Sequence, residues 1–350
     1  MDLPLSPPVD PMLAKAVPAV PEQDSVAGGL SYEPKWDGFR AIAFVDGDEV
    51  ELGSRGSKML TRYFPDLVRV LADQLPSPCV LDGEIVVRTG AAGRERLDWE
   101  ALSQRIHPAA SRVAKLSAET PASFVAFDLL AIGGESLLAK PFSERRAQLE
   151  ELLAAASAPL HLTQVTRDVG LARRWLEEFE GAGLDGVVSK PLDAPYTQGK
   201  RVMLKTKHVR SADVVVLGYR VHKSGAGVGS LLLGLYNSAG DLQSIGGVSA
   251  FSDATRLSLV EELDPLVVRD DSGEAVRGES DRNRFSSNKD TSFVRLEPSR
   301  VMEVKYDQME GSRFRHTAQF LRWSPDREAR SCTFDQLERP IAYDLDDVLA

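Results

Sequence analysis

Glu33-Pro34-Lys35-Trp36-Asp37-Gly38-Phe39-Arg40 is the stretch that decides how this chain of 350 residues is interpreted. From Lys35 onward it places an amine, a carboxylate, a glycine and a guanidinium within six residues. A lysine attacks phosphorus only as the neutral amine, so a nucleophilic Lys35 needs a pKa lowered toward neutrality by nearby cations, a metal or partial burial. The alternative is a strand on which Lys35 and Arg40 are solvated, because short motifs also occur by chance.

Further polar motifs follow this stretch in a fixed order along the chain. They are Ser54-Arg55-Gly56, Asp82-Gly83-Glu84, Phe124-Val125-Ala126-Phe127-Asp128, Asp185-Gly186-Val187-Val188-Ser189-Lys190 and Lys205-Thr206-Lys207. Four of the five have a plain structural explanation: Glu84 as a turn acid, Phe127 as a core aromatic, Arg55 as a loop arginine, and Lys205 with Lys207 as exposed lysines on one face of a strand. The ordered set therefore carries more information than any single motif.

The chain from residue 31 to about 207 alternates strand-like and helix-like runs. Strands are predicted at 40–46, 49–54, 80–88, 124–132 and 185–190, and helices at 65–75, 98–106, 143–156 and 168–180. Asp168 is the expected cap of the last helix. Strands that follow hairpins as well as helices predict an α+β class with a mainly antiparallel sheet.

The pattern of predicted helices and strands changes after a domain boundary that we expect at 208–212. Short strands at 214–219, 230–236, 242–248 and 300–306, with one helix at 253–263, are typical of a small β-barrel of the oligonucleotide-binding (OB) type. Residues 270–292 are expected to form a long polar loop. The predicted organisation is an extended N-terminal arm (1–30), an α+β domain (31–208), a barrel domain (212–335) and an acidic tail (336–350).

Composition limits the class of protein. Net charge is −10, yet residues 195–223 hold seven Lys or Arg against one acid, either a phosphate-sized basic patch or a solvated run of charge. The only cysteines, Cys79 and Cys332, are far apart, which argues against a disulfide scaffold and a zinc site. No apolar run is long enough to span a bilayer and no secretory signal is visible, so we expect a cytoplasmic protein without membrane contact.

In their order and separation, the motifs resemble the covalent nucleotidyltransferase superfamily, which contains ATP-dependent DNA ligases, RNA ligases and mRNA capping enzymes. The resemblance covers roughly residues 30–330, and the stretch 33–40 is similar to the small bacterial ATP-dependent DNA ligases of the ligase C type. It implies that the α+β domain is a nucleotidyltransferase (adenylation) domain followed by an OB-fold domain. A late segment, Phe320-Leu321-Arg322-Trp323-Ser324-Pro325-Asp326-Arg327, resembles the family's C-terminal signature, with two extra residues after Arg322 and Arg327 in place of the usual Lys.

The resemblance also implies roles for individual residues. Lys35 is the expected nucleophile, with Asp37, Lys205 and Lys207 as further catalytic groups. ATP or AMP is expected to contact Glu33, Lys35, Arg40, Glu84, Phe127, Lys190, Lys205, Lys207 and Arg322. Arg55 is the expected ligand of the DNA 5′-phosphate, and Glu84 and Asp185 are the expected ligands of Mg²⁺, with Mn²⁺ as a substitute. The family usually has Glu where this chain has Asp185, which favours contact through water, and Asp326 and Arg327 are the weakest assignments.

The predicted function is an ATP-dependent DNA ligase that seals nicks in duplex DNA through a lysyl-AMP intermediate, in DNA repair and also in replication or recombination. The alternatives are an RNA ligase or RNA-capping guanylyltransferase, and a non-catalytic nucleic-acid-binding module. We expect a monomer associated with the bacterial nucleoid. Only a 30-residue arm precedes the motif, so we also expect modest intrinsic affinity for DNA and a contribution from repair polymerase or primase partners.

Overall fold

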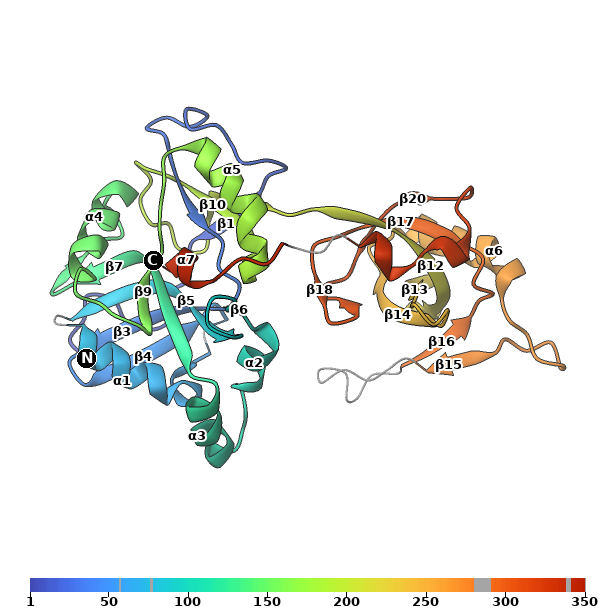
Figure 1. Cartoon of the computed structure of the whole chain (residues 1–350), viewed down its shortest axis with the longest axis horizontal. Coiled ribbons are helices and arrows are strands. Elements are labelled where there is room, and N and C mark those ends of the chain that lie inside the picture. The colour runs from blue at the N-terminus through green and yellow to red at the C-terminus, as the bar shows by residue number, and fades with distance from the viewer. Residues whose placement is uncertain (57, 76–77, 280–290, 338–340, 350) are drawn as a thin grey trace. The chain divides into compact units, whose positions relative to one another are not determined.

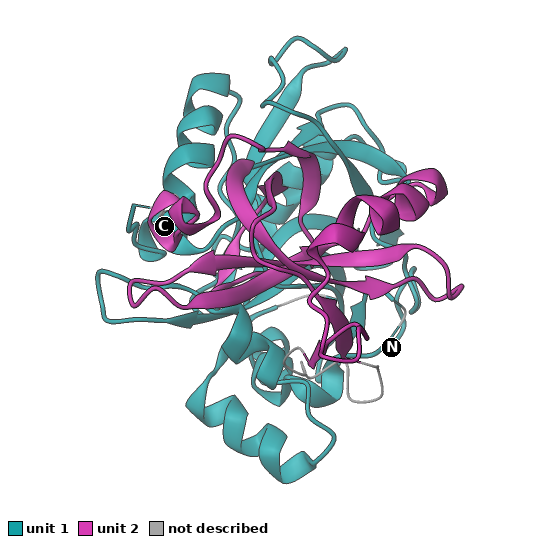
Figure 2. Cartoon of the chain, turned by 90° about the vertical axis from the view of Figure 1, so that its right-hand side faces the viewer, with its two compact units in different colours: residues 1–208, 340–350 teal, residues 209–339 magenta. Residues whose placement is uncertain are grey.

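The chain folds as two compact units in a computed structural model, which describes residues 1–56, 58–75, 78–279, 291–337 and 341–349. The larger unit contains residues 1–208 and 340–350, and the smaller unit contains residues 209–339 (Figure 2). The smaller unit is therefore inserted, in sequence, between two parts of the larger one.

The separate acidic tail predicted at 336–350 is wrong. Residues from 340 onward belong to the larger unit, and Leu345 and Val348 are buried in its core. Apolar residues recur among the acids of this segment, so one face of it can pack while the carboxylates remain at the surface.

The main sheet of the larger unit has the strand order β4-β3-β5-β7-β8, with β6 on β5 and β9 on β7 (Figure 1). Its strands are β3 (Phe39–Asp46), β4 (Glu49–Ser54), β5 (Cys79–Thr89), β6 (Arg96–Leu97), β7 (Ala122–Ile132), β8 (Glu135–Ser136) and β9 (Leu160–Leu162). Strand β7 is buried from Ala122 to Ala131 because both of its faces are covered. Alternation sends Phe124 into one apolar cluster and Val125 and Phe127 into another.

A second sheet of the larger unit has the order β1-β11-β10-β2. Its strands are β1 (Leu13–Ala16), β2 (Leu30–Pro34), β10 (Gly186–Pro191) and β11 (Arg201–Lys207). The pair β1–β11 is parallel, whereas β10 runs antiparallel to both β11 and β2. The predicted N-terminal arm thus supplies strand β1, and fully buried β2 delivers the chain directly to Lys35.

Helices of the larger unit surround these sheets. They are α1 (Pro65–Gln74), α2 (Trp99–Gln104), α3 (Ala110–Glu119), α4 (Phe142–Leu152), α5 (Val169–Glu178) and α7 (Asp346–Leu349), with 3-10 turns η1 (Thr61–Tyr63) and η2 (Phe179–Ala182). The predicted cap of α5 is confirmed, because the Asp168 carboxylate accepts a hydrogen bond from the Gly170 amide at 2.7 Å. Helix α3 was not predicted.

The smaller unit is built around one long strand, β12. Its first half pairs with β17 and its second half with β13, so the sheet curls around the Val214–Val216 core (Figure 2). The elements are β12 (Arg210–Val221), β13 (Val228–Tyr236), β14 (Leu242–Val248), α6 (Asp253–Leu263), η3 (Asp264–Leu266), β15 (Arg277–Glu279), β16 (Ser292–Arg295), β17 (Val301–Tyr306), β18 (Met309–Glu310), β19 (Arg313–Phe314), β20 (Gln319–Trp323), η4 (Ala329–Ser331) and η5 (Phe334–Gln336). The loop predicted at 270–292 instead contains β15 and the start of β16, and its residues 280–290 lie outside the described part of the chain.

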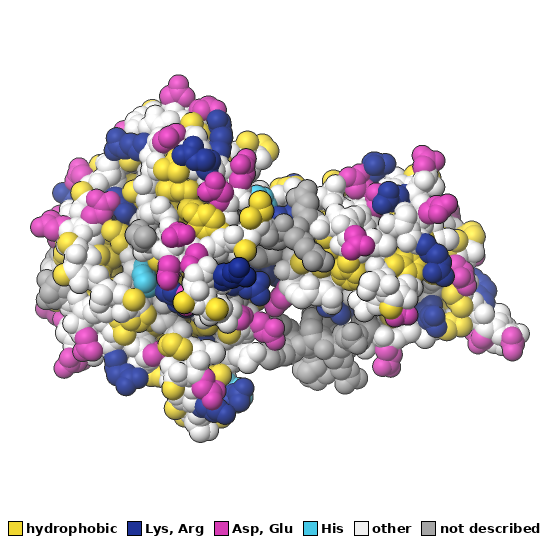
Figure 3. Space-filling model, viewed as in Figure 1, with side chains coloured by type: hydrophobic (Ala, Val, Ile, Leu, Met, Phe, Trp, Pro, Cys, Tyr) yellow, Lys and Arg dark blue, Asp and Glu magenta, His cyan; other side chains and the backbone are white. Residues whose placement is uncertain are grey.

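Charges of both signs are mixed on the visible face of each unit (Figure 3). The seven basic residues between 195 and 223 do not form one continuous segment of a single unit, because the division after His208 separates them. Within the described residues, no helix has the length and apolar character needed to cross a membrane.

Candidate active site

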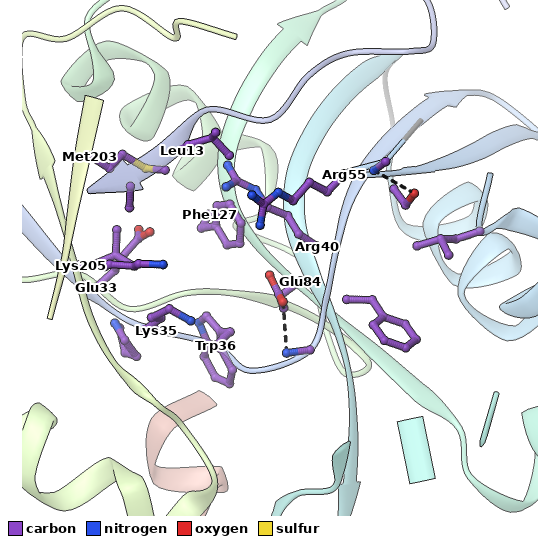
Figure 4. A pocket seen from close by; sticks show the side chains of 18 of the residues that line it. Leu13, Glu33, Lys35, Trp36, Arg40, Arg55, Glu84, Phe127, Met203 and Lys205 are labelled. Atoms are coloured by element: carbon purple, nitrogen blue, oxygen red, sulfur yellow. Dashed lines mark hydrogen bonds between the residues drawn. The ribbon is translucent and has the colours of Figure 1, made fainter. Parts of the chain in front are cut away.

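A cavity of about 690 Å³ in the larger unit collects most of the predicted site residues. Strands of both sheets line it: β2, β10 and β11 from one, and β3, β5 and β7 from the other (Figure 4). The predicted residues along its wall are Glu33, Lys35, Arg40, Arg55, Glu84, Phe127, Lys190 and Lys205. Residues from distant parts of the sequence therefore meet around one hollow.

Lys35 sits just beyond the end of β2, in a backbone segment held from two sides. Its amide donates to the Gly186 carbonyl at 2.9 Å, and its carbonyl accepts from the Asp185 amide at 3.2 Å. Three residues later, a Cβ on Gly38 would lie 2.1 Å from the Ile85 carbonyl oxygen, so only glycine fits this close approach to β5. The Gly38 amide donates to Glu84 Oε1 at 3.1 Å, which ties the Lys35 segment to the predicted Glu84 (Figure 4).

The electrostatic surroundings of Lys35 differ from the prediction. Lys35 Nζ lies 2.7 Å from Asp185 Oδ1, and Lys207 Nζ lies 2.7 Å from Asp185 Oδ2. Burial pulls the pKa of Lys35 down, but the ion pair with Asp185 and the nearby Glu84 and Asp37 carboxylates outweigh it, so the pKa is raised. The expected lowering of the pKa is therefore wrong, because the Asp185 carboxylate lies in direct contact with the amine and favours its charged form.

The pKa shifts of two neighbouring groups, Glu84 and Lys205, favour their neutral forms. Burial raises the pKa of Glu84 to about 8, against the opposing effect of Lys35 and Arg40. Burial and the charges of Lys35 and Lys207 lower the pKa of Lys205. Clustered, partly desolvated groups with shifted pKa values are typical of a catalytic site.

Arg40 is held by a buried carboxylate at the edge of the cavity. Its Nε and Nη2 donate to the two oxygens of Asp82 at 3.0 and 2.6 Å, and the Tyr196 hydroxyl donates to Asp82 Oδ2 at 2.6 Å. The guanidinium carbon lies 5.3 Å from the centre of the Phe127 ring. This bidentate pair fixes Arg40 beside Phe127, and the sequence patterns gave no sign of the contribution of Tyr196.

Glu33 and Lys190 form a buried pair next to Phe127. Lys190 Nζ lies 2.8 Å from Glu33 Oε1 and donates to the Phe127 carbonyl at 2.9 Å. The same ammonium lies 4.8 Å from the centre of the Phe127 ring. Within the described residues, the buried Glu33 Oε2 accepts no hydrogen bond, so an acceptor remains free at the cavity wall.

The remaining predicted residues lie in different places. Arg55 follows β4 in an exposed turn at the rim of the cavity. Arg322, Asp326 and Arg327 belong to the smaller unit, where Arg322 Nε lies 2.7 Å from Glu303 Oε2 and Arg327 Nη2 donates to the Ser331 carbonyl.

The cavity wall also contains residues that the sequence patterns missed. They are Leu13 and Ala14 of β1, Lys58, Met59, Tyr63, Ile106, Arg201 and Met203. The pairing of β1 with β11 brings the N-terminal residues to the wall, a contact between positions about 190 residues apart. The one available signal was the run of basic residues at 195–223, which includes Arg201.

Two family models match successive parts of this chain. Residues 11–207 match the family described as ATP dependent DNA ligase domain, and residues 224–327 match ATP dependent DNA ligase C terminal region. DNA ligase C1 of Mycolicibacterium smegmatis is 54% identical, with 100% of this chain and 99% of that protein covered. DNA ligase C of Mycobacterium tuberculosis is 52% identical, with the same coverage.

Solved structures support the fold. A Lig E DNA ligase aligns with a TM-score of 0.55 at 19% identity, covering 90% of this chain and 99% of that one. The predicted α+β class, an adenylation domain followed by an OB-fold domain, is confirmed by these matches together. The chain belongs to the ATP-dependent DNA ligase family, within the covalent nucleotidyltransferases.

Proposed function

We propose that this enzyme seals nicks in duplex DNA in three steps, with Lys35 carrying AMP between the first and the second. The observation that carries the proposal is the single cavity into which different strands bring Lys35, Glu33, Phe127 and Lys205. In the first step a bond forms between Lys35 Nζ and the α-phosphorus of ATP, the bond to pyrophosphate breaks, and the amine loses a proton. AMP then passes to a 5′-phosphate, and the 3′-hydroxyl attacks and releases it.

Adenine fits the apolar and polar groups at one end of the cavity. The free Glu33 Oε2 is an acceptor that an exocyclic amine of adenine would satisfy, whereas the carbonyl of guanine would meet it with another acceptor. Phe127 offers a ring for stacking, and the Arg40 guanidinium and the Lys190 ammonium lie over that ring, 5.3 and 4.8 Å from its centre. This difference favours ATP over GTP and therefore a ligase over a capping enzyme.

The proton on Lys35 has a nearby acceptor. Asp185 Oδ1 contacts the amine at 2.7 Å, and Lys207 holds the other oxygen of that carboxylate. Lys205 lies on the same strand as Lys207. The like charges of Lys205 and Lys35 repel each other, so Lys205 opposes protonation of Lys35, and it also attracts the negative phosphates. Nucleotide binding is then the event that frees Lys35 for attack.

A divalent ion would need the phosphates of ATP as ligands in addition to the carboxylates of this site. Within the described chain, no group of three or more His, Cys, Asp or Glu could hold a metal by itself. Asp185 and Glu84 supply hard oxygen donors beside Lys35, and Mg²⁺ commonly binds through one or two carboxylates plus phosphate and water. When bound, Mg²⁺ would neutralise phosphate charge, with Mn²⁺ as a substitute.

The DNA-facing roles complete the proposal. Arg55 at the rim is exposed, so its guanidinium suits a terminal 5′-phosphate. Arg322, Asp326 and Arg327 of the smaller unit are proposed to act on pyrophosphate and ATP. We further propose a monomer that works in DNA repair near the nucleoid in the cytoplasm, with repair polymerase or primase proteins as partners.

Labelling with α-³²P-ATP tests the function directly. We expect label on the protein in the presence of Mg²⁺, movement of the label to the 5′ end of nicked DNA, and release as AMP with a sealed strand. EDTA should abolish the protein label and added Mg²⁺ or Mn²⁺ should restore it. Label taken from GTP, or sealing of nicked RNA in preference to DNA, would contradict the proposal.

A further inference from the structure

The C-terminal segment, residues 341–349, lies beyond both family matches but is built into the larger unit (Figure 1). Leu345 is fully buried and Val348 is 1% exposed, although the segment also carries three aspartates. Both side chains belong to the apolar cluster that contains Trp36, next to the nucleophile, and Phe127. A segment outside the shared domains therefore packs behind the nucleotide cavity.

Polar contacts fix the position of the C-terminal segment. The Leu345 amide donates to the Glu95 carbonyl at 2.9 Å, and the Glu95 amide donates to Asp344 Oδ1 at 3.3 Å. Asp346 forms an ion pair with Arg88 of β5. Backbone and side-chain contacts thus attach the segment to β5 and to the chain just before β6.

A short chain of contacts leads from this segment to Lys35. The Gln164 side-chain amide donates to the Val348 carbonyl at 3.0 Å, and the adjacent Thr163 Oγ1 accepts from the Trp36 indole nitrogen at 2.8 Å. The Thr163 amide also donates to the Ala126 carbonyl at 2.9 Å, one residue before Phe127. Gln164 therefore contacts the C-terminal segment, and the adjacent Thr163 contacts Trp36 and the backbone just before Phe127.

The backbone of the C-terminal segment also packs directly against Gly181 of the larger unit. A Cβ on Gly181 would lie 1.8 Å from the Ile341 carbonyl oxygen and 2.6 Å from the Tyr343 amide. The Tyr343 ring packs on Phe179, with ring centres 5.1 Å apart. A substitution at Gly181 can therefore displace the segment without changing any residue in it.

We propose that the C-terminal segment is a positioning element of the nucleotide site, which holds Trp36 and Phe127, and through Trp36 the neighbouring Lys35, in their places around the cavity. The inference deepens the proposed function and rests on it, because ATP is the nucleotide concerned. None of the segment's residues lines the cavity, so its effect passes through Thr163 and Gln164. Displacement of Trp36 alters the geometry of ATP binding without removing a group that touches ATP.

Paired variants of the full chain test this role. Leu345→Asp and Gly181→Ala displace the segment from opposite sides, and the milder Gln164→Ala removes one hydrogen bond to it. Leu257→Asp is the control for the first, since Leu257 lies on α6 of the smaller unit and is 57% exposed. Gly134→Ala is the control for the second, since a Cβ there meets nothing within 4 Å. The rate of Lys35 adenylation is measured against ATP concentration at a temperature at which circular dichroism shows every variant folded.

We expect the KM for ATP to rise by about tenfold or more in the two displacing variants and less in Gln164→Ala, because small misplacements in a reactive site are costly. Both controls should match the parent chain. An unchanged KM in Gly181→Ala and Gln164→Ala would overturn the inference even if Leu345→Asp failed to fold.

Hydrogen exchange without nucleotide separates this inference from the proposed function. Amides of residues 35–38 and 124–128 should exchange faster in Leu345→Asp or Gly181→Ala than in the matched controls. Equal exchange would overturn the positioning role, whether or not the parent chain accepts AMP. Absence of any AMP label on the parent chain, with faster exchange in the variants, would instead refute the proposed function alone.

Discussion

Lys35 combines two features that a free surface lysine lacks. Its ammonium is paired with Asp185, and its backbone is anchored to Gly186 on a neighbouring strand. The anchored backbone fixes where the amine lies, while the ion pair raises its pKa and favours the charged form. Position and protonation of the nucleophile are therefore controlled by different contacts.

Replacement of Lys35 by arginine should abolish formation of the AMP adduct, because a guanidinium is not deprotonated in proteins and cannot attack phosphorus. The conserved charge still pairs with Asp185, so the thermal midpoint should stay close to that of the parent chain. Mass spectrometry of the intact protein after incubation with ATP and Mg²⁺ measures the adduct. Lys115→Arg on the exposed surface of α3 is the matched control. An AMP adduct on the Lys35→Arg variant would show that another residue is the nucleophile.

Glu33 should decide which purine the cavity accepts. In Glu33→Gln the side-chain amide can present donors where the carboxylate presents only acceptors, so the preference for ATP over ITP should fall by about tenfold or more. Adenylation rates with each nucleotide give the ratio. The ratio, rather than either rate, is informative, because the change also leaves Lys190 without its ionic partner. An unaltered ratio would show that Glu33 does not face the base.

At the scale of elements, segments bounded by turn or cap residues were the easiest to predict. Strand β4, strand β14 and helix α6 have the predicted bounds, since their patterns are strong and their ends are marked by turn residues. Strands β1 and β2 were missed, because prolines surround them and their pairing partners lie more than 150 residues away. Long-range pairing, rather than local preference, makes these strands.

Strand β5 depends on a glycine for its packing against β7. A Cβ on Gly83 would lie 2.5 Å from the Phe124 ring and 2.7 Å from the Val125 carbonyl oxygen. Gly83→Ala should lower the free energy of unfolding by about 1–3 kcal/mol through overpacking, and should also weaken ATP binding because Glu84 is the next residue. Urea unfolding measures the first effect. Gly53→Ala on β4, where the Cβ has ordinary contacts at 3.6 Å, should be nearly neutral; equal losses in both variants would refute the steric argument.

At the scale of the whole molecule, a net charge of −10 must be reconciled with a polyanionic substrate. Seven Lys or Arg residues line the cavity against two acids, Glu33 and Glu84. Local charge rather than net charge therefore determines binding to phosphate groups.

Nick sealing should be strongly sensitive to salt. Each phosphate contact adds about −0.9 to the slope of log affinity against log salt concentration, so the KM for nicked DNA should rise steeply with NaCl. Lys35 adenylation in the absence of DNA serves as the control and should change much less. Gel-based sealing assays at several salt concentrations measure both, and equal sensitivity of the two steps would place the effect of salt outside DNA binding.

The order of the motifs from Lys35 to Lys207 was enough to identify the family by resemblance, and the local patterns after residue 211 were enough to predict the barrel, because both depend on residue types along the chain. The tertiary structure alone decided that Asp185 bridges Lys35 and Lys207, that Asp82 and Tyr196 hold Arg40, and that the last residues pack behind the nucleotide site. These contacts join residues far apart along the chain, and their energies depend on burial and distance. Neither quantity is visible in a sequence until the chain has folded.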